Sequence, residues 1–132
     1  MRVLLVDENE ELRDFLAATL NENGIDTVTG ATPEDAIRLA NTERFDGFVI
    51  DSVMGEVDGV ALVEQLRNAK NGKGVPAILM SDIGTALARR IAQNAKCEFL
   101  AKPFGPTQFV EQVRALVKTS SSCIHVALPL VA

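Results

Sequence analysis

Residues 1–20, MRVLLVDENEELRDFLAATL, indicate the fold class of this chain. The apolar run VLLV at residues 3–6 predicts a β-strand that is covered on both faces, as strands of parallel sheets are. The apolar residues after it recur at helical spacing, and Gly24 in NENG can end that helix in a left-handed conformation. This segment therefore predicts a strand followed at once by a helix.

The rest of the chain repeats this alternation. Apolar runs predict strands within residues 45–50, 75–80 and 98–101, and the more polar DTVTG at residues 26–30 predicts a weaker strand near an edge. A segment with helical spacing follows each of them. The helix after the second strand has clear start signals, with Thr32 as N-cap and Pro33 in the first position. Strands that alternate with helices in this way predict an α/β fold, a single doubly wound five-stranded parallel sheet with five helices on its two faces.

The composition is that of an ordinary soluble domain. The chain has 132 residues, of which 47% are hydrophobic and 23% charged, which suits one domain with a substantial core. The net charge of -5 and the lack of a basic run argue against nucleic acid as a direct partner. No apolar run is long enough for a signal-peptide core or a membrane span, and the two cysteines form no disulfide framework. We therefore expect a cytoplasmic protein with no membrane span.

Polar side chains follow four of the predicted strands directly. They are Asp7 and Glu8 after the first strand, Asp51 after the third, Ser81 and Asp82 after the fourth, and Lys102 after the fifth. The carboxyl ends of parallel strands form one edge of the sheet, where ligands bind. A buried ammonium needs an anionic partner, so Lys102 should pair with Asp51 or with a group that Asp51 carries. Clustered carboxylates that water can reach favour a hard cation, and Mg²⁺ suits them.

Each of these residues taken alone also has a purely structural explanation. Asp7 and Glu8 could favour the start of a helix through its dipole, and Asp51 could be an ordinary loop acid. Lys102 could extend its charged end from an apolar surface into water. The functional interpretation depends on all of them meeting at one edge of the sheet.

In these motifs the chain resembles the receiver domain of two-component response regulators. The resemblance covers residues 1–118 and rests on four motifs in order, LLVDENEELR, FVIDSVMGEVDG, AILMS and FLAKPF. It implies a flavodoxin-like sheet with strand order 2-1-3-4-5. It also implies a phosphoryl relay, in which a sensor histidine kinase or a phosphotransfer protein donates a phosphoryl group to an aspartate of the receiver domain.

The resemblance implies roles for the matching residues. Asp51 would be the phosphoryl acceptor, Lys102 would pair with the phosphoryl oxygens, and Ser81 would donate a hydrogen bond to one of them. The ligands of Mg²⁺ would be Asp7, Glu8, Asp51 and the backbone carbonyl of Val53. The peptide bond between Lys102 and Pro103 would be cis. The chain would take part in phosphoryl transfer as an acceptor, with slow autodephosphorylation, and would not be an enzyme in its own right.

The resemblance also implies a switch. Ser81 would move toward the phosphoryl group, and the ring of Phe99 would turn inward behind it. This would alter the face formed by the fourth helix, the fifth strand and the fifth helix, which includes Arg89, Arg90 and Thr107. A downstream protein partner would bind that face.

Three positions depart from the family pattern. Glu8 replaces an aspartate, Gly55 replaces a proline, and Asp82 replaces a small residue beside the phosphoryl pocket. Gly55 and Asp82 favour an alternative, a receiver-like protein-interaction module with weak or no phosphorylation, whereas the intact set of Asp51, Ser81 and Lys102 disfavours it. A hydrolase related to the haloacid dehalogenases is disfavoured, because Val53 stands where those enzymes have a second aspartate and because their nucleophile follows the first strand.

Residues 119–132, TSSSCIHVALPLVA, lie outside the region of resemblance. TSSS predicts a short linker, and the apolar residues after it, interrupted by Pro129, suggest a strand-like tail. We therefore predict a receiver domain at residues 1–118, followed by a C-terminal linker or tail at 119–132.

Overall fold

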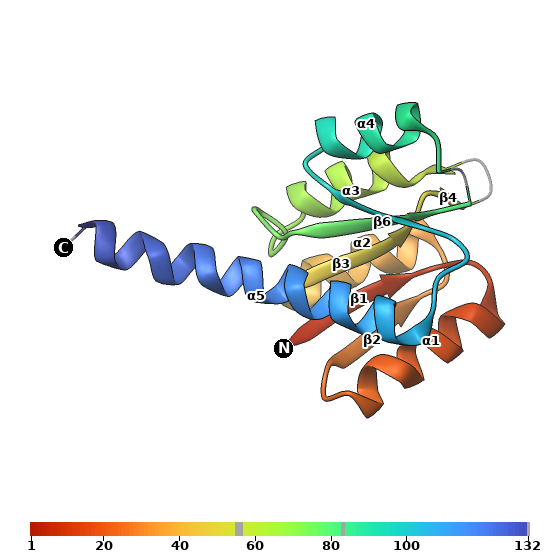
Figure 1. The fold of residues 1–132 in the computed structure, drawn as a ribbon, viewed down its shortest axis with the longest axis horizontal. Coiled ribbons are helices and arrows are strands. Elements are labelled where there is room, and N and C mark those ends of the chain that lie inside the picture. The colour runs from red at the N-terminus through yellow and green to blue at the C-terminus, as the bar shows by residue number, and fades with distance from the viewer. Residues whose placement is uncertain (55–56, 83, 132) are drawn as a thin grey trace.

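The main sheet is parallel throughout, as predicted (Figure 1). The computed structural model describes the backbone of residues 1–54, 57–82 and 84–131 and the side chains of residues 1–53, 58–82 and 84–118. The strand order is β2-β1-β3-β6-β7, which confirms the predicted order 2-1-3-4-5. The five strands are β1 (Arg2–Val6), β2 (Asp26–Gly30), β3 (Gly47–Asp51), β6 (Ala77–Ser81) and β7 (Glu98–Ala101).

Helices cover both faces of this sheet, and all five predicted helices are present (Figure 1). They are α1 (Glu10–Glu22), α2 (Pro33–Thr42), α3 (Gly59–Asn68), α4 (Ala86–Asn94) and α5 (Pro106–Val131). The core clusters place α1 and α5 on one face and α2, α3 and α4 on the other. The predicted start of α2 is confirmed, because the Thr32 hydroxyl accepts a hydrogen bond from the Asp35 N–H. The predicted left-handed glycine after α1 is also confirmed, because Gly24 has φ +80°.

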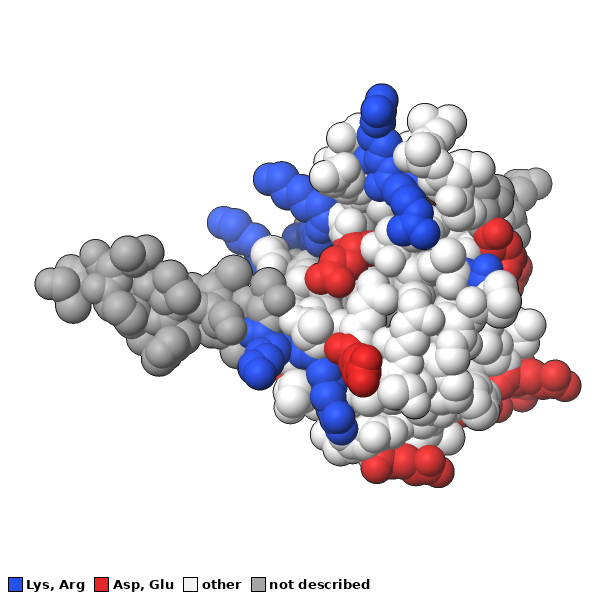
Figure 2. All heavy atoms as spheres, viewed as in Figure 1, with Lys and Arg blue, Asp and Glu red and all other residues white. Residues whose placement is uncertain are grey.

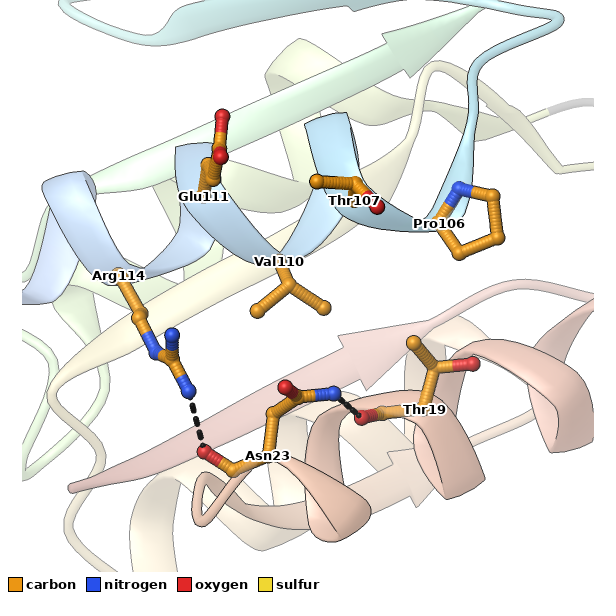
Figure 3. Close-up of a pocket in the computed structure, with 7 residues that line it drawn as sticks. All are labelled: Thr19, Asn23, Pro106, Thr107, Val110, Glu111 and Arg114. Carbon is orange, nitrogen blue, oxygen red and sulfur yellow. Dashed lines mark hydrogen bonds between the residues drawn. The ribbon is translucent and has the colours of Figure 1, made fainter.

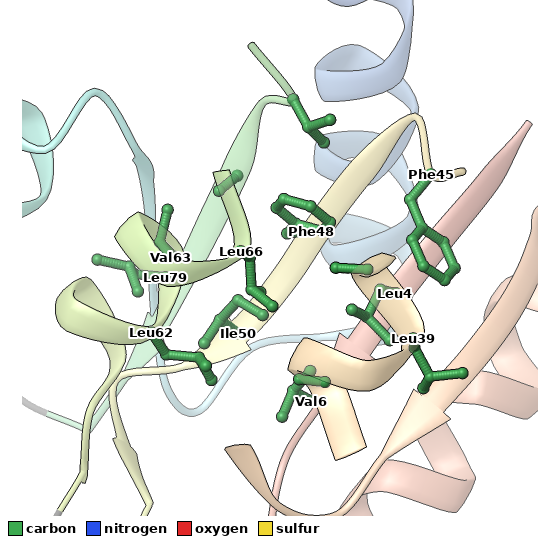
Figure 4. Close-up of a cluster of buried hydrophobic side chains, with 14 of the residues drawn as sticks. Leu4, Val6, Leu39, Phe45, Phe48, Ile50, Leu62, Val63, Leu66 and Leu79 are labelled. Carbon is green, nitrogen blue, oxygen red and sulfur yellow. The ribbon is translucent and has the colours of Figure 1, made fainter. Parts of the chain in front are cut away.

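The strands are apolar along their length because each contributes to two cores. Side chains of β1 alternate between the faces, with Leu4 in the cluster under α2 and α3 and Leu5 in the cluster under α1 and α5. In β3, Phe48 and Ile50 join the first cluster, which Figure 4 shows between the sheet and its helices. The two cores therefore hold the carboxyl ends of the strands at one rigid edge.

Two features differ from the prediction or were not foreseen. Helix α5 continues through residues 119–131, so the predicted linker and strand-like tail are wrong as secondary structure. TSSS contains no glycine or proline that would end the helix. A two-stranded hairpin, β4 (Val53–Met54) and β5 (Val57–Asp58), lies between β3 and α3. Gly55, one of the family departures, lies outside the described residues.

Helix α4 also turns a different face to the sheet than its apolar stripe indicates. Ala92 is buried, whereas Leu87 and Ile91 are 66% and 47% exposed. Among the described residues, no helix is both long enough and apolar enough to cross a membrane.

Candidate functional site

Four strand ends bring the predicted site residues to one edge of the sheet. Asp51 is the last residue of β3 and Ser81 the last residue of β6, while Asp7 and Lys102 directly follow β1 and β7. The Lys102 N–H donates to the Ser81 carbonyl at 2.7 Å, which joins the ends of β6 and β7. A cleft of about 310 Å³ opens there, lined by Asp7, Glu8, Asn9, Asp51, Ser52, Val53, Ser81, Asp82 and Lys102.

Lys102 contacts two carboxylates at the centre of this cleft. Its Nζ lies 3.1 Å from Asp51 Oδ1, which confirms the predicted pairing, and 3.6 Å from Asp7 Oδ2. The three side chains are 15%, 13% and 1% exposed, in the order Lys102, Asp51 and Asp7. The peptide bond between Lys102 and Pro103 is cis, as predicted. One ammonium is thus shared between two nearly buried acids.

The pKa values show that this sharing leaves the cleft short of positive charge. Burial raises the pKa of Asp51, Asp7 raises it further, Lys102 lowers it, and Asp82 adds a smaller increase. Burial by itself would lower the pKa of Lys102, but Asp7 and Asp51 outweigh it and hold that pKa above its usual value. The two carboxylates therefore stabilise the charged form of Lys102, whereas Lys102 does not fully offset the cost of ionising Asp51. A divalent cation would relieve this imbalance.

Asp7 provides a direct test of whether these residues suit a cation. Its Oδ1 accepts a hydrogen bond from the Asn9 N–H at 2.9 Å, while its Oδ2 is buried and accepts no hydrogen bond. A buried carboxylate oxygen without a hydrogen bond is expensive unless a cation faces it. In this structure the Lys102 ammonium, 3.6 Å away, is the cation that faces Oδ2, and a metal ion at the wall of the cleft would share this oxygen with Lys102.

The donors around Asp7 are oxygen atoms only. The described part of the chain holds no group of three His, Cys, Asp or Glu side chains placed to bind a metal. A metal ion would therefore need the carboxylates of Asp7 and Asp51, a backbone carbonyl such as that of Val53, and water. Hard oxygen ligands that leave room for water fit Mg²⁺. Glu8 lines the cleft but is exposed, so it lies further toward solvent than Asp7.

The other predicted site residues occupy two places. Ser81, which is 5% exposed, and Val53 line the cleft itself. Phe99 does not line the cleft; it lies in the wall of an adjoining apolar pocket that also contains Ser81 and Val53. Asp82 is exposed at the cleft, where its carboxylate influences the pKa of Asp51.

Sequence reasoning missed two residues that position Asp7. Asn9 is the N-cap of α1, and its N–H holds Asp7 Oδ1. Arg13, one turn into α1, donates from Nη1 to the Asp7 carbonyl at 3.0 Å. An asparagine just before a helical run is a recognisable cap signal and could have identified Asn9. Nothing in the local pattern marks Arg13.

A second cavity, of about 190 Å³, lies between α1 and α5 and shares no residue with the cleft (Figure 3). Arg114 of α5 donates to the Asn23 carbonyl at 2.8 Å, and the Asn23 amide donates to the Thr19 carbonyl at the same distance. These contacts satisfy the carboxyl-terminal end of α1 and join it to α5. The polar groups drawn there thus serve the packing of the two helices.

Comparison with known proteins agrees with this arrangement. A family model described as the response regulator receiver domain matches residues 3–114. The alkaline phosphatase synthesis transcriptional regulatory protein PhoP of Bacillus subtilis (strain 168) is 27% identical over 119 residues, a match that covers 90% of this chain and 49% of that protein. This chain therefore spans about half the length of that curated relative.

Solved structures give the same result. The receiver domain of the Francisella response regulator 1452 is 29% identical with a TM-score of 0.82, over 90% of this chain and 98% of that one. The receiver domain of sensor histidine kinase PA1611 from Pseudomonas aeruginosa PAO1, solved with a magnesium ion coordinated in its active site cleft, has the same fold, with a TM-score of 0.78 and 24% identity over 89% of this chain and 97% of that one. Since the family model matches most of its length, this chain belongs to the family of response regulator receiver domains.

Proposed function

We propose that this chain accepts a phosphoryl group on Asp51 from a phosphohistidine of a sensor histidine kinase or phosphotransfer protein. The observation that carries the proposal is the position of Asp51, at the end of β3, in ion-pair contact with Lys102 and in one cleft with Asp7 and Ser81. Membership of the receiver family supports the same assignment.

The chemistry needs a nucleophile, alignment and charge neutralisation. A carboxylate oxygen of Asp51 attacks phosphorus, the P–N bond of the phosphohistidine breaks, and its electron pair goes to the imidazole nitrogen. The product is an acyl phosphate on Asp51. Lys102, already 3.1 Å from Asp51 Oδ1, pairs with the transferred oxygens, and the Ser81 hydroxyl donates a hydrogen bond to one of them.

Asp7, Asp51 and the Val53 carbonyl would hold Mg²⁺, with Glu8 at the rim of the cleft. When bound, Mg²⁺ supplies positive charge that offsets the negative charge gathering on the phosphoryl oxygens. The hydrogen-bond-free Oδ2 of Asp7 supports this assignment, as does the magnesium ion in the PA1611 receiver domain.

The signal would leave through Ser81 and Phe99 to the face formed by α4, β7 and α5. A downstream protein would read that face in the cytoplasm, and the receiver domain would comprise residues 1–118. In this role the chain is a signalling module that binds proteins and does not contact nucleic acid directly.

Two observations favour the alternative of an interaction module with weak phosphorylation. Asp82 adds a carboxylate to the lining of the cleft, and Glu8 is exposed where the family has a shorter aspartate. Both change the charge or the geometry around Asp51 without removing any of the core residues.

Intact-mass measurement after incubation with acetyl phosphate and Mg²⁺ separates the two functions. We expect one added phosphoryl group, which disappears when Asp51 is changed to Asn or when Mg²⁺ is chelated. Asp14→Asn, an exposed acid on α1, is the matched control and should label like the wild type. Labelling that persists in Asp51→Asn would move the acceptor elsewhere, and an unlabelled wild type would favour the interaction module.

A further inference from the structure

An apolar pocket of about 170 Å³ adjoins the phosphoryl cleft on the side of α4. Its lining includes Ile91 of α4 and Phe99 of β7. Ser52, Val53 and Ser81 line both this pocket and the cleft. A movement of Ser81 therefore changes the shape of the pocket that Phe99 also lines.

The Phe99 ring is covered by an arginine from α4. The Arg89 guanidinium carbon lies 4.7 Å from the ring centroid, well within the range of a cation–π contact. Arg89 is exposed and Phe99 is half-buried, so the contact joins a solvent-exposed guanidinium to a ring that also lines the pocket. The backbone of β7 is held independently, because the Gln112 amide donates to the Phe99 carbonyl at 3.1 Å. Movement at this position thus concerns the side chain.

We propose that Arg89 is a positioning residue that holds the Phe99 ring in the arrangement belonging to unmodified Asp51. In this structure Lys102 pairs directly with the free carboxylate of Asp51 while Arg89 stacks on Phe99. A ring that turns inward toward Ser81 moves away from an exposed guanidinium and loses the stack. Arg89 therefore opposes the inward turn and sets how strongly the domain responds to phosphorylation. This inference rests on the proposed function of Asp51.

The expected size of the effect is modest and measurable. A cation–π contact at a partly exposed site changes the ratio of ring positions by about two- to fivefold. Because ligand binding and ring position are linked equilibria, loss of Arg89 should strengthen binding of a phosphoryl analogue by up to the same factor.

The first test needs no phosphoryl group. Phe99 ring signals are followed by NMR in the unmodified full chain with carbon-13-labelled phenylalanine, for the wild type, Arg89→Ala and Arg90→Ala. Arg90 is the adjacent, exposed arginine of α4, so both variants lose one positive charge. We expect Arg89→Ala alone to shift the ring populations, by about two- to fivefold. Equal effects of both variants, or an unmoved ring in Arg89→Ala, would overturn the proposal.

The second test measures binding of beryllofluoride, a phosphoryl analogue, with Mg²⁺. Arg89→Ala should bind it about two- to fivefold more tightly than the wild type. The same substitution in a Phe99→Leu background should have no such effect, since the ring is gone. An equal gain in beryllofluoride affinity in both backgrounds would show that Arg89 does not act through the Phe99 ring. Loss of binding in every protein, the wild type included, would instead refute the proposed function, while the ring measurement would still decide the role of Arg89.

Discussion

At the scale of single residues, the site is defined by a shortage of positive charge. Lys102 is the cation that contacts Asp51 and Asp7, and the Asp82 carboxylate lines the same cleft. Asp82 raises the pKa of Asp51, so its charge acts on the acceptor even though its side chain is exposed. The ion pairs of Lys102 in the described part of the chain are with Asp7 and Asp51, which speaks against a resting pair between Asp82 and Lys102.

We therefore expect Asp82→Ala to speed phosphorylation by acetyl phosphate. A second carboxylate at the rim repels the incoming phosphoryl oxygens, and at an exposed position this repulsion amounts to about 1 kcal/mol or less, which is up to about fivefold in rate. Initial rates at matched Mg²⁺ and ionic strength measure the effect. Asp82→Asn keeps the size and removes the charge, so it should match Asp82→Ala. A slower or unchanged Ala variant would mean that Asp82 helps to orient Lys102.

At the scale of elements, one arginine ties α3 to the far end of α4. Arg67, in the last turn of α3, donates to three backbone carbonyls, those of Val75 at 3.1 Å, Ala95 at 2.7 Å and Lys96 at 2.9 Å. These carbonyls belong to the loop before β6 and to the end of α4. The carboxyl-terminal end of α4 is thus anchored, while Arg89 contacts the Phe99 ring and Ile91 lines the adjoining apolar pocket.

Arg67→Ala should lower the free energy of unfolding by about 2–3 kcal/mol, because three carbonyls lose a charged donor. Urea unfolding measures the change. Arg38→Ala is the control, since Arg38 is exposed on α2 and makes an i,i+3 ion pair with Asp35 at 3.5 Å. Such a pair contributes about 0.5 kcal/mol or less. Equal changes in the two variants would show that the Arg67 contacts add nothing beyond the loss of a surface arginine.

At the scale of the whole molecule, charge is distributed unevenly. On the face seen in Figure 2, acidic side chains lie at the right-hand and lower rim and also near the centre, while most basic side chains lie in the upper and left parts. The strands of Figure 1 point toward the right-hand rim. The candidate cleft thus lies at an acidic end of a domain whose net charge is already -5. This arrangement favours cation binding and makes global stability depend on the ionisation of the cleft.

Asp51→Asn should therefore be more stable than the wild type near neutral pH. Burial and Asp7 raise the pKa of Asp51, so the folded state binds this proton more tightly than the unfolded state does. Stability is then lost as pH rises through the raised pKa, and the Asn variant, which cannot ionise, escapes that loss. Its advantage should shrink as pH falls toward the usual aspartate range.

Thermal unfolding between pH 4 and 8, without divalent cations, measures this difference, with Asp14→Asn as the control for a lost surface acid. Saturating Mg²⁺ should reduce the gap, because the cation stabilises the wild-type folded state. A less stable Asp51→Asn protein at pH 7 would show instead that the ion pair with Lys102 outweighs the burial of Asp51.

The sequence by itself determined the layers and the set of polar residues at the strand ends, and its resemblance to the receiver family implied the strand order. Apolar periodicity is a local property, and the run at residues 3–6 already requires cover on both faces. Parallel topology then places the carboxyl end of every strand at one edge, so the sequence already predicts that Asp51 and Lys102 pair. Start and stop signals such as Thr32 and Gly24 are local for the same reason.

Only the tertiary structure decided which neighbours these residues meet. Leu87 and Ile91 repeat like core residues yet are exposed, because Ala92 is the residue of α4 that the sheet and α3 cover. Asp7 contacts Lys102, and Arg89 contacts Phe99. In both pairs the two residues belong to different elements, and a local sequence pattern does not specify how such elements align. Spacing along the chain specifies which residues share a face, whereas contacts across elements depend on how the packed helices settle against the sheet.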